Sequence, residues 1–254
     1  MTQRIYTSFL AAKQHSEKRF VVLIDPDKMR LSNVSNVIDA AVMSKVDYFF
    51  VGGSLIVNDM MNYCLDAIRE AAPHIPTILF PSSPQQINEK ADAILFLSLI
   101  SGRNPDFLIG QHVLAAPTLR RSSLEIVPTG YMLIDGGAPT TATYISGTLP
   151  IPSNKEEIAA CTALAGEMLG LKTLYLDAGS GAKRAVPEAM ITAVSESVRL
   201  PLVVGGGMNT AEKVSICAHA GANIIVVGNA LEKSPSLVAE MSSAVHEAAR
   251  AAQF

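Results

Sequence analysis

Residues 200–232 read LPLVVGGGMNTAEKVSICAHAGANIIVVGNALE and contain the same local pattern twice. Apolar runs at residues 202–204 and 224–227 each lead into glycine and then into a helical pattern. An uninterrupted apolar run of this length is typical of a strand buried on both faces of a parallel sheet. The stretch therefore predicts two consecutive strand–turn–helix units.

The two turns are rich in glycine and expose backbone N–H groups. Gly205, Gly206 and Gly207 have no Cβ to hold a ligand away, and Gly228-Asn229 offers a second bare turn at the start of a helix. Two such turns side by side form a cradle for phosphate, as the loops after strands 7 and 8 of a (β/α)₈ barrel commonly do. The alternative is that these glycines only permit tight turns.

The same alternation of strand and helix extends over the rest of the chain. Apolar runs predict strands at residues 20–24, 48–51, 77–80, 94–97, 125–135, 173–176, 202–204 and 224–227. Eight parallel strands joined by right-handed crossovers favour a closed (β/α)₈, or TIM, barrel over an open doubly wound sheet. A proline at position 128 suggests that the fifth strand starts irregularly.

One crossover is too short for a full helix. Residues 81–91 separate the third strand from the fourth and include two prolines. We expect the third outer helix to be missing or replaced by a loose segment, which would expose an apolar groove for a long hydrocarbon chain. A merely short helix is the alternative. Residues 138–153, which lack a helical period, are expected to form a lid or binding loop.

The composition limits the class of protein. The chain has 254 residues, 49% of them hydrophobic, and no shift in composition, so we expect one barrel domain over residues 1–254. A net charge of −3 with scattered basic residues argues against a nucleic-acid partner. There is no apolar run long enough to span a membrane and no apolar signal segment at the N-terminus, so we expect a cytoplasmic protein.

Polar side chains follow several of the predicted strands, where barrel enzymes place their active sites. Asp25 and Asp27 follow the first strand and Ser54 the second, a set that suits Mg²⁺ or, alternatively, a turn with a helix cap. Lys28, Arg103 and Asn104 are candidates for binding an anionic group, with surface and capping roles as the alternatives.

Tyr175 and Asp177 share one face of the sixth strand, next to the predicted phosphate cradle. A carboxylate at this place could accept a proton from a hydroxyl of a bound phosphate ester.

Several motifs together resemble those of the geranylgeranylglyceryl phosphate synthase family, whose bacterial relatives include heptaprenylglyceryl phosphate synthases. The motifs are VLIDPDK (22–28), FFVGGS (49–54), SGRNPDFLIGQH (101–112), PTGYMLIDGG (128–137), YLDAGSG (175–181), VVGGGM (203–208) and VVGNALE (226–232). The chain looks more like the larger group of this family, which uses geranylgeranyl diphosphate. It departs from the usual YLE motif, because Asp177 is one methylene shorter than glutamate.

The resemblance implies a modified barrel without its third helix, and Mg²⁺ held by Asp25 and Ser54. It also implies that sn-glycerol 1-phosphate is bound by residues of three strand ends, and that a prenyl diphosphate lies with its tail in the side groove. The glycerol phosphate residues are Tyr175, Leu176, Asp177, Ala178, Gly179, Ser180, Gly181, Gly205, Gly206, Gly207, Gly228 and Asn229.

The implied activity is that of a Mg²⁺-dependent prenyltransferase in ether-lipid synthesis. The 3-hydroxyl of glycerol 1-phosphate attacks C1 of the prenyl diphosphate, with Asp177 as the base and Tyr175 beside it. There are three alternatives. The first is a sugar-phosphate isomerase that uses Asp25 and Asp135, the second is a heptaprenyl-specific synthase, and the third is a protein that binds a prenyl lipid without turnover. An apolar side wall also leads us to expect a homo-oligomer, either a dimer or a hexamer.

Overall fold

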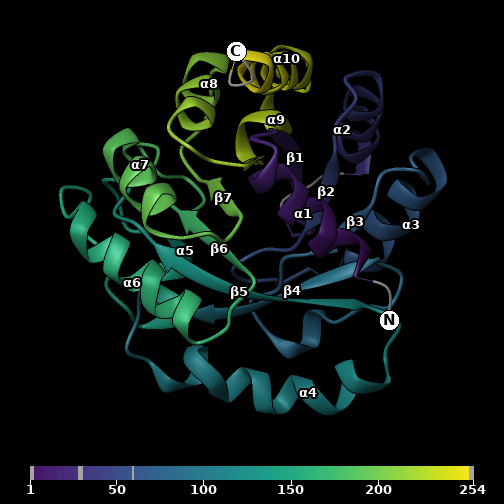
Figure 1. Cartoon of the computed structure of the whole chain (residues 1–254). Helices are drawn as coiled ribbons and strands as arrows, with labels where there is room; N and C mark the ends of the chain where they lie inside the picture. The colour runs from purple at the N-terminus through teal and green to yellow at the C-terminus, as the bar shows by residue number, and fades with distance from the viewer. Residues whose placement is uncertain (1–2, 28–30, 59, 252–254) are drawn as a thin grey trace.

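The fold is a closed barrel of eight parallel strands in sequential order (Figure 1). A computed structural model describes residues 3–27, 31–58 and 60–251. The strands are β1 (Arg19–Ile24), β2 (Tyr48–Val51), β3 (Thr77–Leu79), β4 (Ala93–Leu99), β5 (Glu125–Leu133), β6 (Thr173–Asp177), β7 (Leu202–Gly205) and β8 (Ile224–Val227). Strand β8 pairs with β1 and closes the sheet, which confirms the predicted barrel and its eight strands.

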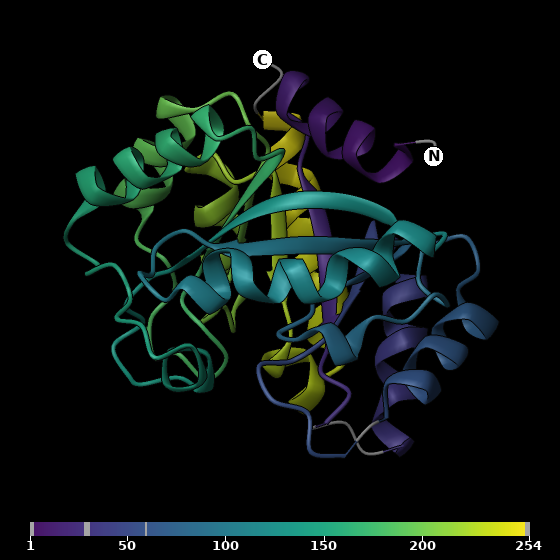
Figure 2. The same ribbon diagram turned by 90° about the horizontal axis from the view of Figure 1, so that it is seen from below.

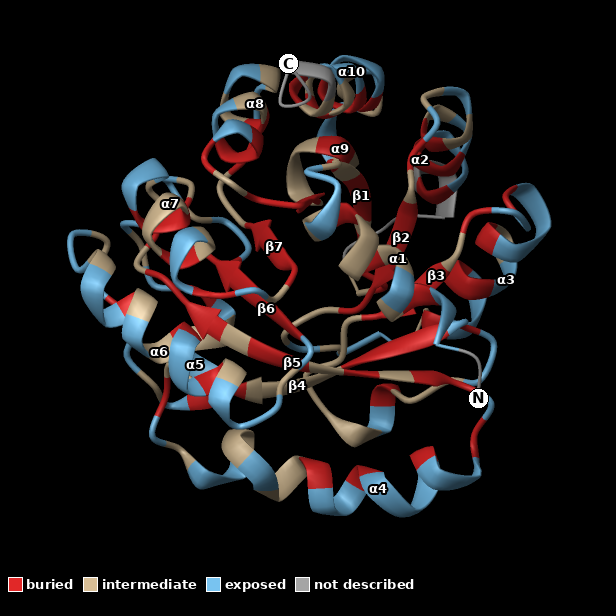
Figure 3. Ribbon diagram, in the orientation of Figure 1, coloured by how far each residue is buried: buried red, intermediate tan, exposed pale blue. Residues whose placement is uncertain are grey.

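Helices surround the barrel on most sides (Figure 1). They are α1 (Arg4–Gln14), α2 (Leu31–Met43), α3 (Met61–Ala71), α4 (Gln111–Arg121), α5 (Thr141–Ser146), α6 (Glu156–Met168), α7 (Glu188–Ser197), α8 (Ala211–His219), α9 (Asn229–Lys233) and α10 (Leu237–Ala251). A 3₁₀ turn, η1 (Pro84–Gln86), and a π-helical turn, η2 (Asp106–Gly110), complete the list. Figure 3 shows the strands buried and the outer helix faces exposed.

Side chains alternate along each strand between the barrel interior and the layer beneath the helices. On β6, Tyr175 belongs to the interior cluster, whereas Leu174 and Leu176 belong to the outer one. Because alternation has a period of two residues, Asp177 continues the inward row of Tyr175 and reaches the open end of the barrel. The sheet thus fixes which strand residues can meet a ligand.

The connection from β3 to β4 contains η1 and no α-helix over residues 80–92, all of which the structure describes. The outer helix expected after the third strand is therefore missing, as predicted; helix α3 is the one between β2 and β3. Helix α4 lies on the far side of this gap, alongside β4 and β5 (Figure 2). Residues of the connection and of α4 line one cavity, so the prediction of a groove at the missing helix is supported.

Two details differ from the predicted elements: residues 138–153 are not wholly irregular, and the fifth strand does not start irregularly. The role of residues 138–153 as a lid or binding loop stays a prediction. Residues 138–153 contain the short helix α5, which begins with a capping box at Thr140 and ends at Gly147 with a φ of 61°. Strand β5 is regular at Pro128, which pairs with Phe96. The proline is tolerated because β6 begins only at Thr173, opposite Thr129, so no β6 residue pairs with Pro128.

The two ends of the barrel differ. Helix α1 covers one end, while α5 and α9 lie at the other, where the strands have their C-terminal ends (Figure 2). The Glu125 carboxylate at the start of β5 accepts the backbone N–H groups of Ile5 and Tyr6 at 2.8 and 2.7 Å. The Gln3 side chain makes no capping hydrogen bond, so Glu125, which is distant in sequence, caps the start of α1 instead. Within the described residues, no helix is long and apolar enough to cross a membrane.

Candidate functional site

A polar pocket of about 1180 Å³, counted with its open mouth, lies at the C-terminal ends of the strands. Its walls come from residues at and after the ends of β1, β2, β3, β6, β7 and β8. Of the predicted site residues, it is lined by Asp25, Ser54, Tyr175, Asp177, Gly179, Ser180, Gly181, Gly206, Gly207, Gly228 and Asn229. The barrel thus brings together residues from opposite ends of the sequence.

Asp177 is held by two hydrogen bonds at the edge of this pocket. Tyr131 donates its hydroxyl hydrogen to Oδ2 at 2.6 Å, and Gly179 donates its N–H to Oδ1 at 2.7 Å. Burial raises the pKa of the Asp177 carboxyl above its usual value, although both hydrogen bonds act in the opposite direction. A carboxylate with a raised pKa is a stronger base, provided that it is ionised at the working pH.

Tyr131 and Tyr175 stand beside Asp177 with Phe80. The ring centroids of Phe80 and Tyr175 lie 5.0 Å apart in a stacked pair, and Tyr131 meets both rings edge-on. Burial, followed by the Asp177 carboxylate, raises the pKa of both tyrosines well above the ordinary value. Both phenols therefore stay protonated, and Tyr131 acts only as a donor toward Asp177.

The glycines after β7 leave room for Asp177 and for a ligand. Gly206 and Gly207 have φ values of 83° and 70°, in the left-handed region that side chains avoid. A Cβ on Gly206 would lie 2.6 Å from both Asp177 Oδ1 and the backbone nitrogen of Gly179. The close approach of the ends of β6 and β7 thus depends on the absence of a side chain at Gly206.

The loops after β6 and β8 are linked across the pocket. The Asn229 amide donates to the Ser180 hydroxyl oxygen at 2.9 Å. Asn229 begins α9, as predicted, but α9 has only five residues. An anion at this turn would therefore be bound by exposed backbone N–H groups near glycine, and the dipole of a long helix would not contribute.

Asp25 and Ser54 lie on neighbouring strand ends and both line the polar pocket. A Cβ on Gly53 would lie 2.7 Å from Asp25 Oδ1, so glycine leaves space around the carboxylate. One carboxylate and one hydroxyl fit Mg²⁺, which takes few protein oxygens and otherwise prefers water and phosphate.

Asp27 does not line the pocket but fixes the loop after Ser54. Its Oδ1 accepts the backbone N–H groups of Val57 and Asn58 at 2.9 and 2.6 Å. The loops after β1 and β2 are thereby tied together.

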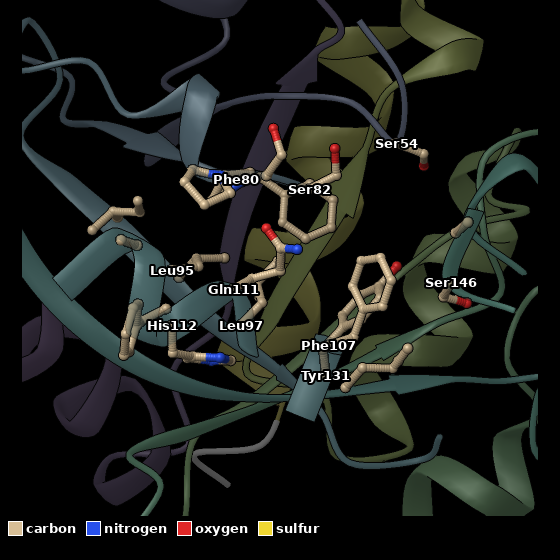
Figure 4. A pocket seen from close by; sticks show the side chains of 18 of the residues that line it. Ser54, Phe80, Ser82, Leu95, Leu97, Phe107, Gln111, His112, Tyr131 and Ser146 are labelled. Carbon is tan, nitrogen blue, oxygen red and sulfur yellow. The ribbon is translucent and has the colours of Figure 1, made fainter. Parts of the chain in front are cut away.

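An apolar groove of about 870 Å³, including its open part, runs beside β4 (Figure 4). Strand β4 supplies Ile94 and Phe96 from its outward face, and α4 supplies Ala115 and Leu119. The lining contains no Asp, Glu, Lys or Arg. Its volume and character fit a hydrocarbon chain.

The groove and the polar pocket meet. Gly53, Ser54 and Phe80 line both cavities. A ligand with an apolar tail and a charged head could therefore place the head at Ser54 and the tail along β4.

A protein-family model described as the PcrB family matches residues 13–249 of the chain. The chain belongs to the PcrB family. A relative from Chitinophaga pinensis, named geranylgeranylglyceryl phosphate synthase, is 52% identical over 249 residues that cover 98% of each chain. One of the same name from Thermococcus gammatolerans is 39% identical over 230 residues, 90% of each chain.

A solved structure is similar over almost the whole chain. It is the crystal structure of (S)-3-O-geranylgeranylglyceryl phosphate synthase from Thermoplasma acidophilum in complex with substrate sn-glycerol-1-phosphate. The TM-score is 0.90 at 30% identity, with 97% of this chain and 99% of that chain covered. These similarities confirm the family resemblance of the sequence motifs and the barrel fold of this PcrB-family chain.

Some predicted site residues lie elsewhere in the fold. Leu176 and Ala178 face the outer layer, and Gly205 accepts the Ala178 N–H at 3.1 Å within the sheet edge. Arg103 and Asn104 are not among the residues that line either cavity. The Asn104 side chain accepts the Asp106 N–H and donates to the Ser146 carbonyl, which is the capping alternative. Lys28 lies outside the described residues.

Sequence reasoning missed several residues of this PcrB-family site. Tyr131 and Phe80 were not singled out, although the inward period of β5 contains Thr129 and Tyr131 and could have indicated a phenol facing Asp177. Lys233 lines the polar pocket from the end of α9, with no signal beyond its charge.

Proposed function

We propose that this chain joins a prenyl group, most readily geranylgeranyl, to the 3-hydroxyl of sn-glycerol 1-phosphate and releases diphosphate. The observation that supports this function is the junction of two unlike cavities at Gly53, Ser54 and Phe80. A glycine-lined polar pocket suits a small phosphate ester, and an apolar groove suits an isoprenoid tail. The reacting atoms of the two substrates would meet where the cavities join.

The glycerol phosphate half is supported by the Thermoplasma acidophilum structure, which is described as a complex with substrate sn-glycerol-1-phosphate. In the present chain the corresponding cavity has bare turns at Gly206-Gly207 and at Gly228-Asn229, and a cation at Lys233. Backbone N–H groups and a lysine are suitable partners for a phosphate dianion.

Asp177 is suited to act as the base. The 3-hydroxyl oxygen attacks C1 of the prenyl diphosphate, the C1–O bond to diphosphate breaks, and the hydroxyl proton passes to Asp177. Tyr131 and Gly179 hold the carboxylate in one orientation, so little reorganisation is needed during the transfer. The raised pKa of Asp177 favours acceptance of the proton.

Asp25 and Ser54 would hold Mg²⁺, which supplies charge neutralisation for a diphosphate leaving group. Gly53 keeps space beside the Asp25 carboxylate. The apolar groove excludes water from the tail and orients C1 toward the junction.

A direct assay tests the proposal. Labelled glycerol 1-phosphate, a prenyl diphosphate and Mg²⁺ are incubated with the full chain, and an organic-extractable phosphate ether is measured. We expect product with sn-glycerol 1-phosphate and much less with the 3-phosphate enantiomer. Competition among farnesyl, geranylgeranyl and heptaprenyl diphosphates should favour the geranylgeranyl compound. Absence of any ether product would refute the function.

Substitution of Asp177 tests the role of the base. Asp177→Ala should lower turnover by about 10²-fold or more, whereas Asp177→Glu, which keeps the carboxylate, should retain much of it. Near-native turnover of the alanine variant would remove Asp177 from this role.

The isomerase alternative lacks its second acidic group. Asp135 was its candidate on the fifth strand, but it pairs with Arg184 at 3.7 Å and accepts the Gly137 N–H. It is not among the residues that line the polar pocket.

A further inference from the structure

The side chain of Gln86 joins the connection that replaces the third outer helix to the loop after β2. Gln86 belongs to η1, and only 8% of it is exposed. Its amide nitrogen donates to the Ser82 hydroxyl at 2.9 Å and to the Gly53 carbonyl at 3.3 Å. Its side-chain oxygen accepts the Ser82 N–H at 3.0 Å. Both ends of the side-chain amide are therefore engaged.

Gln86 lines neither cavity, but both of its partners do. Ser82 lines the apolar groove, and Gly53 lines the groove and the polar pocket. Figure 4 shows Ser82 beside Phe80, which also lines both cavities. An effect of Gln86 on bound substrates would therefore pass through Ser82 and Gly53.

The bond to Gly53 begins where the pairing of β2 with β3 ends. The Phe80 N–H donates to the Val51 carbonyl at 2.9 Å. Two residues after Val51, the Gly53 carbonyl takes its hydrogen from the Gln86 side chain. Because a peptide unit is planar, a fixed Gly53 carbonyl also fixes the N–H of Ser54 and the direction of the chain there.

We propose that Gln86 is a positioning residue, through which a prenyl tail packed against residues 81–84 holds the Gly53-Ser54 turn in its reactive geometry. This inference rests on the proposed function and deepens it. Binding energy from a remote part of a substrate raises turnover when it is used to orient the reacting groups. The alternative is a purely structural role, in which the amide only satisfies a buried carbonyl.

Steady-state kinetics with two tail lengths test the proposal. Geranylgeranyl diphosphate can contact more of the groove wall than the shorter geranyl diphosphate. Gln86→Met keeps the length of the side chain and loses its three hydrogen bonds. Gln86→Asn keeps the amide, but it is one methylene too short to retain all three. Gln85→Met is the matched control, because Gln85 is the exposed neighbour in η1.

We expect the wild-type kcat to be about tenfold higher with the long substrate than with the short one. Gln86→Met should lower kcat about tenfold for the long substrate and less than about twofold for the short one, so that the advantage of the long tail disappears. Gln86→Asn should reduce this advantage, and Gln85→Met should keep it. The KM for sn-glycerol 1-phosphate should stay within about twofold of wild type in each variant.

Hydrogen exchange gives a readout without turnover. Geranylgeraniol, which has the tail but no diphosphate, is added to each protein, and exchange over residues 52–58 is followed by mass spectrometry. With the alcohol present, the wild type and Gln85→Met should exchange about threefold more slowly here. Gln86→Met should show no such protection.

Three results would overturn the proposal. They are an unchanged long-tail advantage in Gln86→Met together with a lower free energy of unfolding, no long-tail advantage in the wild type, and an equal loss of the advantage in Gln85→Met. If Gln86→Met does not fold, Gln86→Asn decides by the same criteria.

The two readouts separate this inference from the proposed function. Ether formation by the wild type without protection of residues 52–58 by geranylgeraniol would refute the role of Gln86 alone. Protection without ether formation would refute the proposed function alone.

Discussion

At the end of the barrel covered by α1, acidic side chains accept backbone N–H groups of the protein itself, whereas at the other end polar groups surround a cavity. Around α1, both oxygens of Glu125 accept helix N–H groups. At the open end, Asp25, Ser54 and the glycine turns face the polar pocket. Barrel folds commonly divide stability and catalysis between their two ends in this way.

A repeated contact stabilises the end of the barrel that α1 covers, which we call the closed end. Asp47, Asp92 and Asn223, each just before an even-numbered strand, accept a backbone N–H at the start of the preceding odd-numbered strand. The distances are 2.8, 2.8 and 3.0 Å to the nitrogens of Phe20, Thr77 and Leu202. Substitutions here should affect folding, and those at the open end should affect catalysis.

Gly206→Ala should have the largest effect and is confined to the open end. The new Cβ would push against Asp177 Oδ1 and Gly179, and we expect turnover to fall about 10³-fold. Gly170→Ala is the matched control, because its φ of 88° imposes similar backbone strain with no atom within 4 Å of the added Cβ. A similar loss of turnover in both variants would show that strain, not displacement of Asp177, is responsible.

Glu125→Ala should affect the closed end alone. The variant loses the two hydrogen bonds that the Ile5 and Tyr6 N–H groups donate to the Glu125 carboxylate, which should lower the free energy of unfolding by about 3 kcal/mol. Denaturant unfolding measures this change, and kcat per folded molecule should stay near the wild-type value. A large fall in kcat without loss of stability would contradict the division between the two ends.

Tyr131→Phe should change the pH dependence of the reaction. The Tyr131 hydrogen bond lowers the pKa of Asp177, so its removal raises that pKa further. Because the reaction needs ionised Asp177, the rate falls as pH drops through this pKa, and the acid limb should move to higher pH. We expect about a tenfold lower rate near neutral pH. An unchanged pH profile would show that Tyr131 does not tune the base.

Asp27→Ala should have the smallest effect. Without Asp27 the N–H groups of Val57 and Asn58 lose their acceptor, and the loop that carries Ser54 becomes less ordered. We expect about a fivefold higher Mg²⁺ requirement, with kcat at saturating Mg²⁺ nearly unchanged. Binding of Mn²⁺, followed by electron paramagnetic resonance, gives a readout independent of turnover. Equal metal affinity in both proteins would assign Asp27 a purely local role.

Local patterns in the sequence predicted much of the fold. Apolar runs located all eight strands, and the short segment before β4 predicted the missing helix, because both depend on neighbouring residues. The helix α5 escaped prediction since six residues are too few to display a helical period.

The site was predicted only in part. Glycine turns and strand-end carboxylates are visible in the sequence, whereas the bond from Tyr131 to Asp177 joins residues 46 positions apart. Its existence depends on the register of β5 against β6, which no single segment reveals. The bond from Asn104 to the Ser146 carbonyl depends in the same way on the folded chain, because Ser146 ends the distant helix α5.

The absent third helix has a consequence for how such a binding site can arise. Strand β3 still pairs with β2 and β4, so every backbone ladder of the barrel is closed without help from the outer layer. The missing helix therefore removes side-chain packing from the outer layer of the barrel, but every hydrogen-bonded strand pair remains. Residues 81–91 could accordingly be varied to adapt the barrel to tails of different bulk, provided that the hydrogen bond from the Gln86 amide to the Gly53 carbonyl is kept, because Gly53 lies where the two cavities meet.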